Sequence, residues 1–134
     1  MSKPKLFITR RWPKAVEEAA KEEFDVTLND KDIPLSIEDM SNALKRYDAI
    51  SPTVTDILSP KVFDVENLSC KILCNYGVGY SHIDIPSAKN LGICVTNTPD
   101  VLSDCTADIA MTLMLMAARR AGEGERELRA DKWH

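Results

Sequence analysis

The hydrophobic residues of this chain fall into short apolar runs that alternate with segments of helical spacing. Five runs are rich in β-forming residues: Lys5–Thr9, Asp25–Leu28, Tyr47–Ser51, Lys71–Asn75 and Ile93–Thr96. Regular alternation of strands and helices with short connections is typical of a parallel sheet covered by helices. The pattern therefore predicts an α/β fold over residues 1–98, with a flavodoxin-like parallel five-stranded sheet and helices on both faces.

Residues that begin and end helices mark the boundaries of the predicted helices. Ser36 and Asp39 resemble a capping box, with Asp39 in place of the usual Glu or Gln. Asp84 is expected to cap a short helix that begins near Pro86, and Gly92 is expected to end it.

The last third of the chain has a different pattern. Ser103 is expected to cap a helix, and the segment Cys105–Ala118 is apolar almost all round it. Its only polar residues are Thr106, Asp108 and Thr112. A helix of this kind needs burial on more than one side, which one five-stranded sheet does not supply. The charged segment Gly122–His134 predicts a further short helix or a tail.

Composition narrows the class of protein. With 134 residues the chain is one domain, or one domain with an appendage, and 44% hydrophobic residues argue against disorder. The net charge of −4 does not favour binding to nucleic acid or to an anionic membrane. No apolar run reaches the length of about 18 residues that a membrane span needs, and the N-terminal segment does not resemble a secretory signal.

The cysteines and histidines do not form a metal-binding pattern. Cys70, Cys74, Cys94 and Cys105 form no C-x-x-C motif, and neither histidine has ligand spacing, so no metal site is expected. Without a secretory signal, reduced thiols in a cytoplasmic protein are expected.

The loop from Asn75 to His82 carries the most suggestive motif, Gly77-Val78-Gly79. A dinucleotide-binding fingerprint needs a third glycine at the position of His82, so that fingerprint fails. Two readings remain open: a tight turn that needs glycine torsions, or a loop whose backbone N–H groups face a small anion. A Ser–His–Asp triad from residues 81–84 is rejected, because groups so close in sequence seldom converge. The pair Arg10-Arg11 is interpreted as a solvated, charged face.

Several segments together resemble the D-isomer-specific 2-hydroxyacid dehydrogenases, and within that family they are most similar to glyoxylate/hydroxypyruvate reductase. The segments are Ser51–Asp56, Asn75–Asp84, Gly92–Ala110 and Ala118-Arg-Arg120. One departure is His82, where the family usually has Asn before Ile-Asp.

The resemblance implies a two-domain enzyme of which this chain is the N-terminal part. Residues 1–98 would form the substrate-binding domain. Residues 99–134 would form a crossing and dimerisation helix and the start of the cofactor domain, so that a long apolar crossing helix follows the sheet. The glycine fingerprint and the catalytic Arg, Glu and His would lie beyond His134, so the 134-residue chain alone is expected to be inactive.

The resemblance also implies an activity and site residues. The activity would be reduction of a small 2-oxo acid, of the glyoxylate or hydroxypyruvate type, to the D-2-hydroxy acid with NAD or NADP, in a homodimer. The backbone N–H groups of Val78 and Gly79 would bind the substrate carboxylate, Thr53 and Val54 would wall the substrate, and Thr106 would contact the cofactor. The alternative is a stand-alone, non-catalytic flavodoxin-like module that binds a small carboxylate.

Overall fold

The structure is a computed structural model that describes residues 2–132. The chain divides into two units, Met1–Pro99 and Asp100–His134, and each is described by itself.

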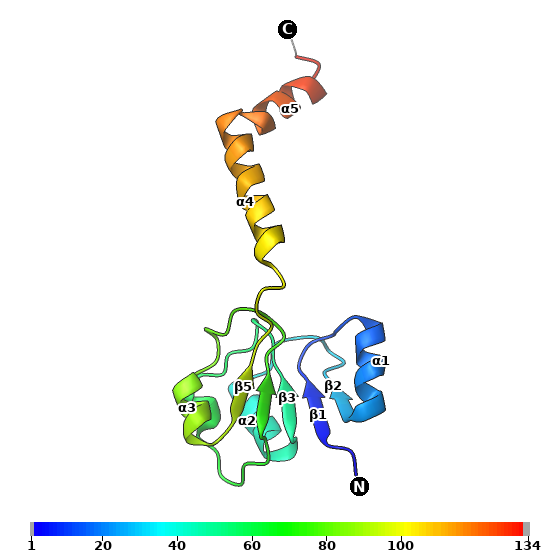
Figure 1. The fold of residues 1–134 in the computed structure, drawn as a ribbon, viewed down its shortest axis with the longest axis vertical. Coiled ribbons are helices and arrows are strands. Elements are labelled where there is room, and N and C mark those ends of the chain that lie inside the picture. Colours follow the sequence, from blue (N-terminus) through cyan, green and yellow to red (C-terminus); the bar gives the residue numbers. More distant parts are fainter. Residues whose placement is uncertain (1, 133–134) are drawn as a thin grey trace. The chain divides into compact units, whose positions relative to one another are not determined.

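The first unit is an α/β sheet domain (Figure 1). Its elements are β1 (Lys5–Ile8), α1 (Lys14–Glu23), β2 (Asp25–Leu28), α2 (Ile37–Arg46), β3 (Ala49–Ser51), a 3-10 helix η1 (Pro60–Phe63), β4 (Ile72–Cys74), α3 (Ile85–Asn90) and β5 (Cys94–Thr96). The strand order is β2-β1-β3-β4-β5, and every neighbouring pair is parallel. The predicted parallel five-stranded sheet is therefore confirmed, in the order of flavodoxin-like folds.

The register of the sheet decides which side chains share a face. Leu6 pairs with Ala49 and Ala49 pairs with Ile72, so these three residues lie on one face. Ile50 and Leu73 pair with each other and lie on the opposite face.

Helices cover both faces of the sheet, as predicted. One helix, α1, lies on the face of Leu6 and Ile8, against which Ala20 packs. The other face is covered by α2, η1 and α3, which contribute Met40, Ala43, Leu44, Val62, Phe63 and Ala88 to the main core. Leu44 and Leu73 are completely buried, and each buried side chain of this size contributes about 1.5–3 kcal/mol to stability.

The predicted helix ends of the first unit are confirmed. The Ser36 hydroxyl accepts a hydrogen bond from the Asp39 N–H (3.1 Å) and donates one to the Asp39 carboxylate (2.6 Å). The Asp84 carboxylate accepts a hydrogen bond from the Ser87 N–H (3.0 Å) at the start of α3. Gly92 follows the end of α3 with φ +73°, a left-handed conformation that glycine adopts without strain.

The second unit consists of α4 (Ser103–Ala118) and α5 (Ala121–Arg129). The long apolar crossing helix expected here is wrong: α4 has 16 residues, and no helix within residues 2–132 has the length and apolar content of a membrane span. The physical reason is local, since Arg120 adopts a left-handed conformation (φ 52°) that ends the helical run and turns the chain into α5. Ser103 is the first helical residue and Leu102 takes the N-cap position, so the expected Ser103 cap is also wrong.

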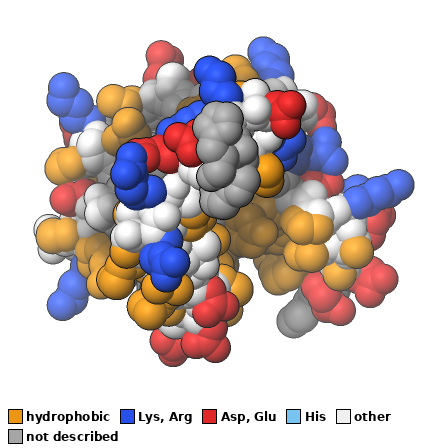
Figure 2. Space-filling view, turned by 90° about the horizontal axis from the view of Figure 1, so that it is seen from above, with side chains coloured by type: hydrophobic (Ala, Val, Ile, Leu, Met, Phe, Trp, Pro, Cys, Tyr) orange, Lys and Arg blue, Asp and Glu red, His pale blue; other side chains and the backbone are white. Residues whose placement is uncertain are grey.

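The side chains of the second unit are exposed. No residue of α4 is buried, and Ile109, Leu113 and Met114 are about three-fifths exposed (61%, 60% and 63%). By contrast, α5 is charged, with ion pairs from Arg120 to Glu123 and from Arg129 to Glu125. Figure 2, which draws both units, shows hydrophobic, acidic and basic side chains interspersed on the face that it presents. The unit therefore combines one unpartnered apolar helix with one polar helix.

Candidate functional site

Two loops lie side by side at the carboxyl edge of the sheet, where open α/β folds bind ligands. One follows β3 and spans residues 52–56, and the other follows β4 and spans residues 75–82. The Tyr76 N–H donates to the Pro52 carbonyl (2.8 Å), and Thr53 and Tyr76 form an isolated parallel bridge. Strand pairing thus continues past the strand ends and joins the two loops that carry the four predicted substrate residues.

The glycines of the second loop, Gly77 and Gly79, do not adopt backbone torsions that only glycine tolerates. Gly92 is the only glycine with positive φ in the part of the chain that the structure describes. A Cβ atom at Gly77 would lie 3.4 Å from the Val54 side chain, an ordinary van der Waals distance, so the two loops are in contact here. A Cβ atom at Gly79 would meet nothing within 4 Å, so this position faces open space. The reading of a tight turn that needs glycine torsions is therefore not supported.

The carbonyl groups of Gly77, Val78 and Gly79, at the centre of the second loop, all accept hydrogen bonds. The Asn75 side-chain amide donates to the Gly77 carbonyl (3.0 Å) and to the Gly79 carbonyl (2.9 Å). The Asn97 side-chain amide donates to the Val78 carbonyl (2.9 Å). The carbonyl oxygens, which are the negative ends of the peptide dipoles, are thus bonded to side chains of the protein and not directed at a ligand.

The N–H groups at the centre of the same loop are free. Within residues 2–132, neither the Val78 N–H nor the Gly79 N–H makes a hydrogen bond. Val78 is half-buried and Gly79 is exposed, so the centre of the loop reaches the surface. Successive backbone N–H groups with their carbonyls tied back form the kind of concavity that binds anions.

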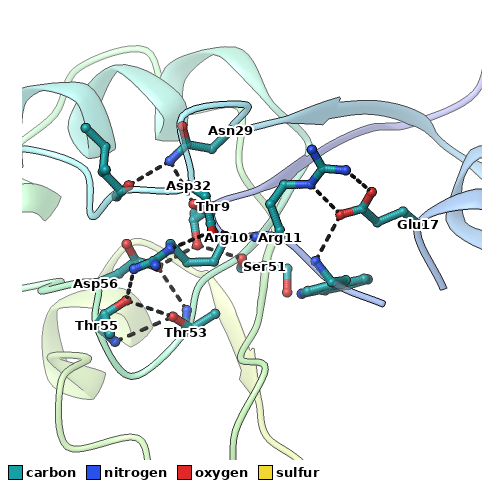
Figure 3. Close-up of polar contacts among 12 residues, drawn as sticks. Thr9, Arg10, Arg11, Glu17, Asn29, Asp32, Ser51, Thr53, Thr55 and Asp56 are labelled. Carbon is teal, nitrogen blue, oxygen red and sulfur yellow. Dashed lines mark hydrogen bonds and ion pairs between the residues drawn. The ribbon is translucent and has the colours of Figure 1, made fainter. Parts of the chain in front are cut away.

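The first loop is held from behind by Asp56, which is completely buried. One oxygen, Oδ2, accepts hydrogen bonds from the Thr53 N–H (2.9 Å) and the Thr9 hydroxyl (2.5 Å), as Figure 3 shows. The other oxygen, Oδ1, is buried and has no partner within the described residues. The result is a nearly buried Thr53 (9% exposed) followed by an exposed Val54 (61%), which points its side chain outward.

A third segment, the turn after β1, is fixed by an ion pair that the sequence reading missed. Glu17 is only 1% exposed and accepts hydrogen bonds from Arg11 at two positions (2.8 and 2.7 Å) and from the Trp12 N–H (2.9 Å). The Arg11 guanidinium, followed by the Trp12 N–H, lowers the pKa of Glu17 from its ordinary 4.5 to about 2. The interpretation of Arg10-Arg11 as a merely solvated face is wrong, since Arg10 also donates to the Thr55 hydroxyl (2.9 Å).

One signal for this ion pair was present in the sequence. Glu17 lies at helical spacing with Ala20 and Phe24, so it places a carboxylate on the inward face of α1. A charge at such a position needs a partner nearby. The ion pair also holds Trp12, whose ring lies 5.5 Å from the ring of Tyr76 in the second loop.

His82 and Asp84, considered above as members of a triad, have separate structural partners. His82 Nε2 lies 2.9 Å from Asn75 Oδ1, and Asp84 caps α3. Burial lowers the pKa of His82, against an opposing contribution from Asp56. The rejection of a triad stands on this geometry, because Asp84 bonds to the helix N-terminus and not to the histidine.

A family model described as "D-isomer specific 2-hydroxyacid dehydrogenase, catalytic domain" matches residues 6–125. The chain belongs to the D-isomer specific 2-hydroxyacid dehydrogenase family. This agrees with the resemblance that the sequence motifs indicate.

Two relatives and one solved structure illustrate the similarity. A glyoxylate reductase of Pyrococcus horikoshii is 41% identical over 134 residues, which is 98% of this chain and 39% of the relative. A glycerate dehydrogenase of Hyphomicrobium methylovorum is 38% identical over 99% of this chain and 41% of its own length. The crystal structure of an NAD-binding D-isomer specific 2-hydroxyacid dehydrogenase from Polaromonas has a TM-score of 0.80 and 35% identity, and it covers 98% of this chain and 41% of that one. This 2-hydroxyacid dehydrogenase chain thus spans about two fifths of the length of the relatives it matches.

The described residues do not form a complete dinucleotide site. A dinucleotide pyrophosphate needs a glycine-rich turn that opens directly into a helix, with a third glycine for close packing. Here His82 holds the third position, and α3 begins only at Ile85. Thr106, the single predicted cofactor contact, lies in the first turns of α4 in the second unit, where its N–H donates to the Leu102 carbonyl (2.9 Å). The first unit therefore suits a small anion better than a dinucleotide.

Proposed function

We propose that the first unit is the substrate-binding part of a 2-hydroxyacid dehydrogenase, and that Val78 and Gly79 bind the substrate carboxylate through their backbone N–H groups. The observation that carries the proposal is the contrast between the carbonyl groups and the N–H groups at the centre of the loop. Its carbonyls are tied back by Asn75 and Asn97, and the two N–H groups remain free within residues 2–132.

Thr53 and Val54 form the wall opposite the carboxylate. Support comes from the hydrogen bond of the Tyr76 N–H to the Pro52 carbonyl and from the position of Val54 beside Gly77. The wall suits a small 2-oxo acid of the glyoxylate or hydroxypyruvate type, which would be reduced to the D-2-hydroxy acid. Two relatives, a glyoxylate reductase and a glycerate dehydrogenase, favour the same substrates.

The remaining roles concern the protein as a whole. NAD or NADP would supply the hydride from a cofactor domain that begins within residues 99–134, and Thr106 would contact it. A homodimer would cover the apolar side chains of α4, none of which is buried in the single chain. Four free cysteines fit a reducing, cytoplasmic setting.

Titration of the 15N-labelled chain with oxalate, an unreactive analogue of a 2-oxo acid, tests the anion site. The amide signals of Val78 and Gly79 are expected to shift, because their N–H groups would donate to the ligand. In Gly79→Val the new side chain enters open space, so the fold is retained, while the branched Cβ crowds the ligand and weakens binding by about tenfold or more.

The matched control is Gly124→Val, which also adds a side chain in open space but lies in α5. This variant should bind oxalate as the wild-type chain does. Oxalate shifts confined to residues outside the two loops, or equal affinity in Gly79→Val, would contradict the proposal.

A further inference from the structure

We infer that Asn75 and His82 are positioning residues for the anion loop, residues 75–82: His82 orients the Asn75 amide, and that amide holds the Gly77 and Gly79 carbonyls so that the Val78 N–H faces the ligand. The inference rests on the proposed function and extends it to two residues that touch no substrate.

The first step concerns Asn75, which is 2% exposed and lies at the end of β4. Both hydrogens of its amide are used, one on the Gly77 carbonyl (3.0 Å) and one on the Gly79 carbonyl (2.9 Å). Two carbonyls held toward the same nitrogen fix the backbone between them. The carbonyl and the N–H of one peptide unit point in opposite directions, so the bond to the Gly77 carbonyl aims the Val78 N–H away from Asn75. The Gly79 N–H is set in the same way by the Val78 carbonyl, which the Asn97 amide holds.

The second step concerns the direction of the amide itself. An amide rotated by 180° would place its oxygen against the two loop carbonyls, and three acceptor oxygens would then face one another without a donor. The Asn75 oxygen is instead directed at His82 Nε2, 2.9 Å away. An amide oxygen only accepts, so His82 must carry a proton on Nε2 and donate it. The histidine and the two carbonyls thus favour the same orientation of the amide.

The third step is that His82 is itself fixed. Its backbone carbonyl accepts a hydrogen bond from the Leu58 N–H (2.9 Å), and Leu58 is completely buried. Burial also lowers the pKa of His82, which favours a neutral ring. A neutral ring with its proton on Nε2 is sufficient for this role, so the bond to Asn75 does not need a charged histidine.

The chain of contacts therefore runs from the core through Leu58, His82 and Asn75 to the anion loop. It also gives a physical meaning to the departure from the usual Asn at position 82. The His82 ring reaches the Asn75 oxygen, whereas the centre of the loop, Gly77-Val78-Gly79, has no side-chain donor of its own.

The test uses the 15N-labelled full chain and three variants. His82→Leu removes the donor at similar size, and His82→Gln keeps an N–H group at the end of the side chain. Ser81→Ala, a change at an exposed neighbour, is the matched control. Three quantities are measured for each: oxalate affinity, hydrogen exchange of the Asn75 side-chain amide without ligand, and the urea midpoint of unfolding.

His82→Leu is expected to bind oxalate about tenfold more weakly and to exchange the Asn75 amide hydrogens at least about tenfold faster. His82→Gln and Ser81→Ala should stay within about twofold of the wild-type chain in both quantities. A purely structural role would lower the urea midpoint but leave the affinity of the folded chain unchanged. Equal affinity in His82→Leu, or no rescue in His82→Gln, would overturn the inference.

Two further results keep the inference distinct from the proposed function. If His82→Leu fails to fold, Asn75→Ala removes the same clamp and is expected to weaken oxalate binding equally. If the wild-type chain binds no oxalate, the proposed function is overturned. The exchange measurement alone then decides the positioning: fast exchange in His82→Leu with rescue in His82→Gln supports it, and identical exchange in all variants refutes it.

Discussion

Replacing Asp56 separates two roles of a buried carboxyl group, filling space and accepting hydrogen bonds. In Asp56→Ala the Thr53 N–H loses its acceptor, and Thr53 is only 9% exposed. Thr9 loses less, because its hydroxyl also lies 3.0 Å from the Ser51 carbonyl and can donate there instead. The substitution therefore strands one buried donor rather than two.

The magnitude follows from this count. A stranded buried N–H costs about 1–3 kcal/mol, and removal of the unpartnered Oδ1 returns part of the cost. We expect Asp56→Ala to lower the free energy of unfolding by about 2 kcal/mol. Asp56→Asn keeps one acceptor oxygen for both donors, and its NH2 group takes the place of the unpartnered oxygen. Its cost should stay below about 1 kcal/mol.

Urea unfolding of the three chains, followed by far-UV circular dichroism, measures these differences. Hydrogen exchange of the Thr53 amide supplies a local readout, which should quicken in Asp56→Ala and remain slow in Asp56→Asn. If both substitutions cost the same free energy, hydrogen-bond acceptance by Asp56 is not what holds the first loop, and the reasoning fails.

Two further predictions concern the turn after β1 and the apolar helix. Because the pKa of Glu17 is lowered, its ionised form stabilises the fold fully above pH 4.5 and progressively less as the pH falls toward 2. The urea midpoint of the wild-type chain should therefore exceed that of Glu17→Gln by less and less across that interval. A difference in midpoint that stays constant with pH would contradict this. The exposed apolar side chains of α4 should make the chain dimerise at low micromolar concentration, and Met114→Glu (63% exposed) should weaken the dimer in sedimentation velocity, whereas Leu128→Glu in α5 (65%) should not. A wild-type monomer with α4 still helical would count against the dimer.

The sequence predicted those parts of the fold that local patterns control. Short apolar runs rich in β-forming residues predicted the strands, and the caps at Ser36 and Asp84 predicted two helix starts, because each depends on a few neighbouring residues. Even the proximity of the two loops could be expected, since the carboxyl ends of parallel strands meet at one edge.

The sequence did not predict the contacts between distant segments. Asp56 joins the end of β1 to the loop after β3, and Asn75 meets His82 across a loop. Nothing in local spacing distinguishes these polar residues from ordinary loop residues. The left-handed turn at Arg120 was missed for another reason: arginine rarely adopts this conformation, so its type gives no warning.

In the proposed site, main-chain N–H groups bind the anion. Carboxylate binding and the choice between acids can therefore change independently, although they usually change together. Most substitutions at position 78 leave an N–H group in place, so the hold on a carboxylate survives changes of side chain. Val54, exposed on the neighbouring loop, can vary without touching that hold. Single substitutions at Val54 could therefore change which acid is bound during evolution, because each variant would still bind a carboxylate.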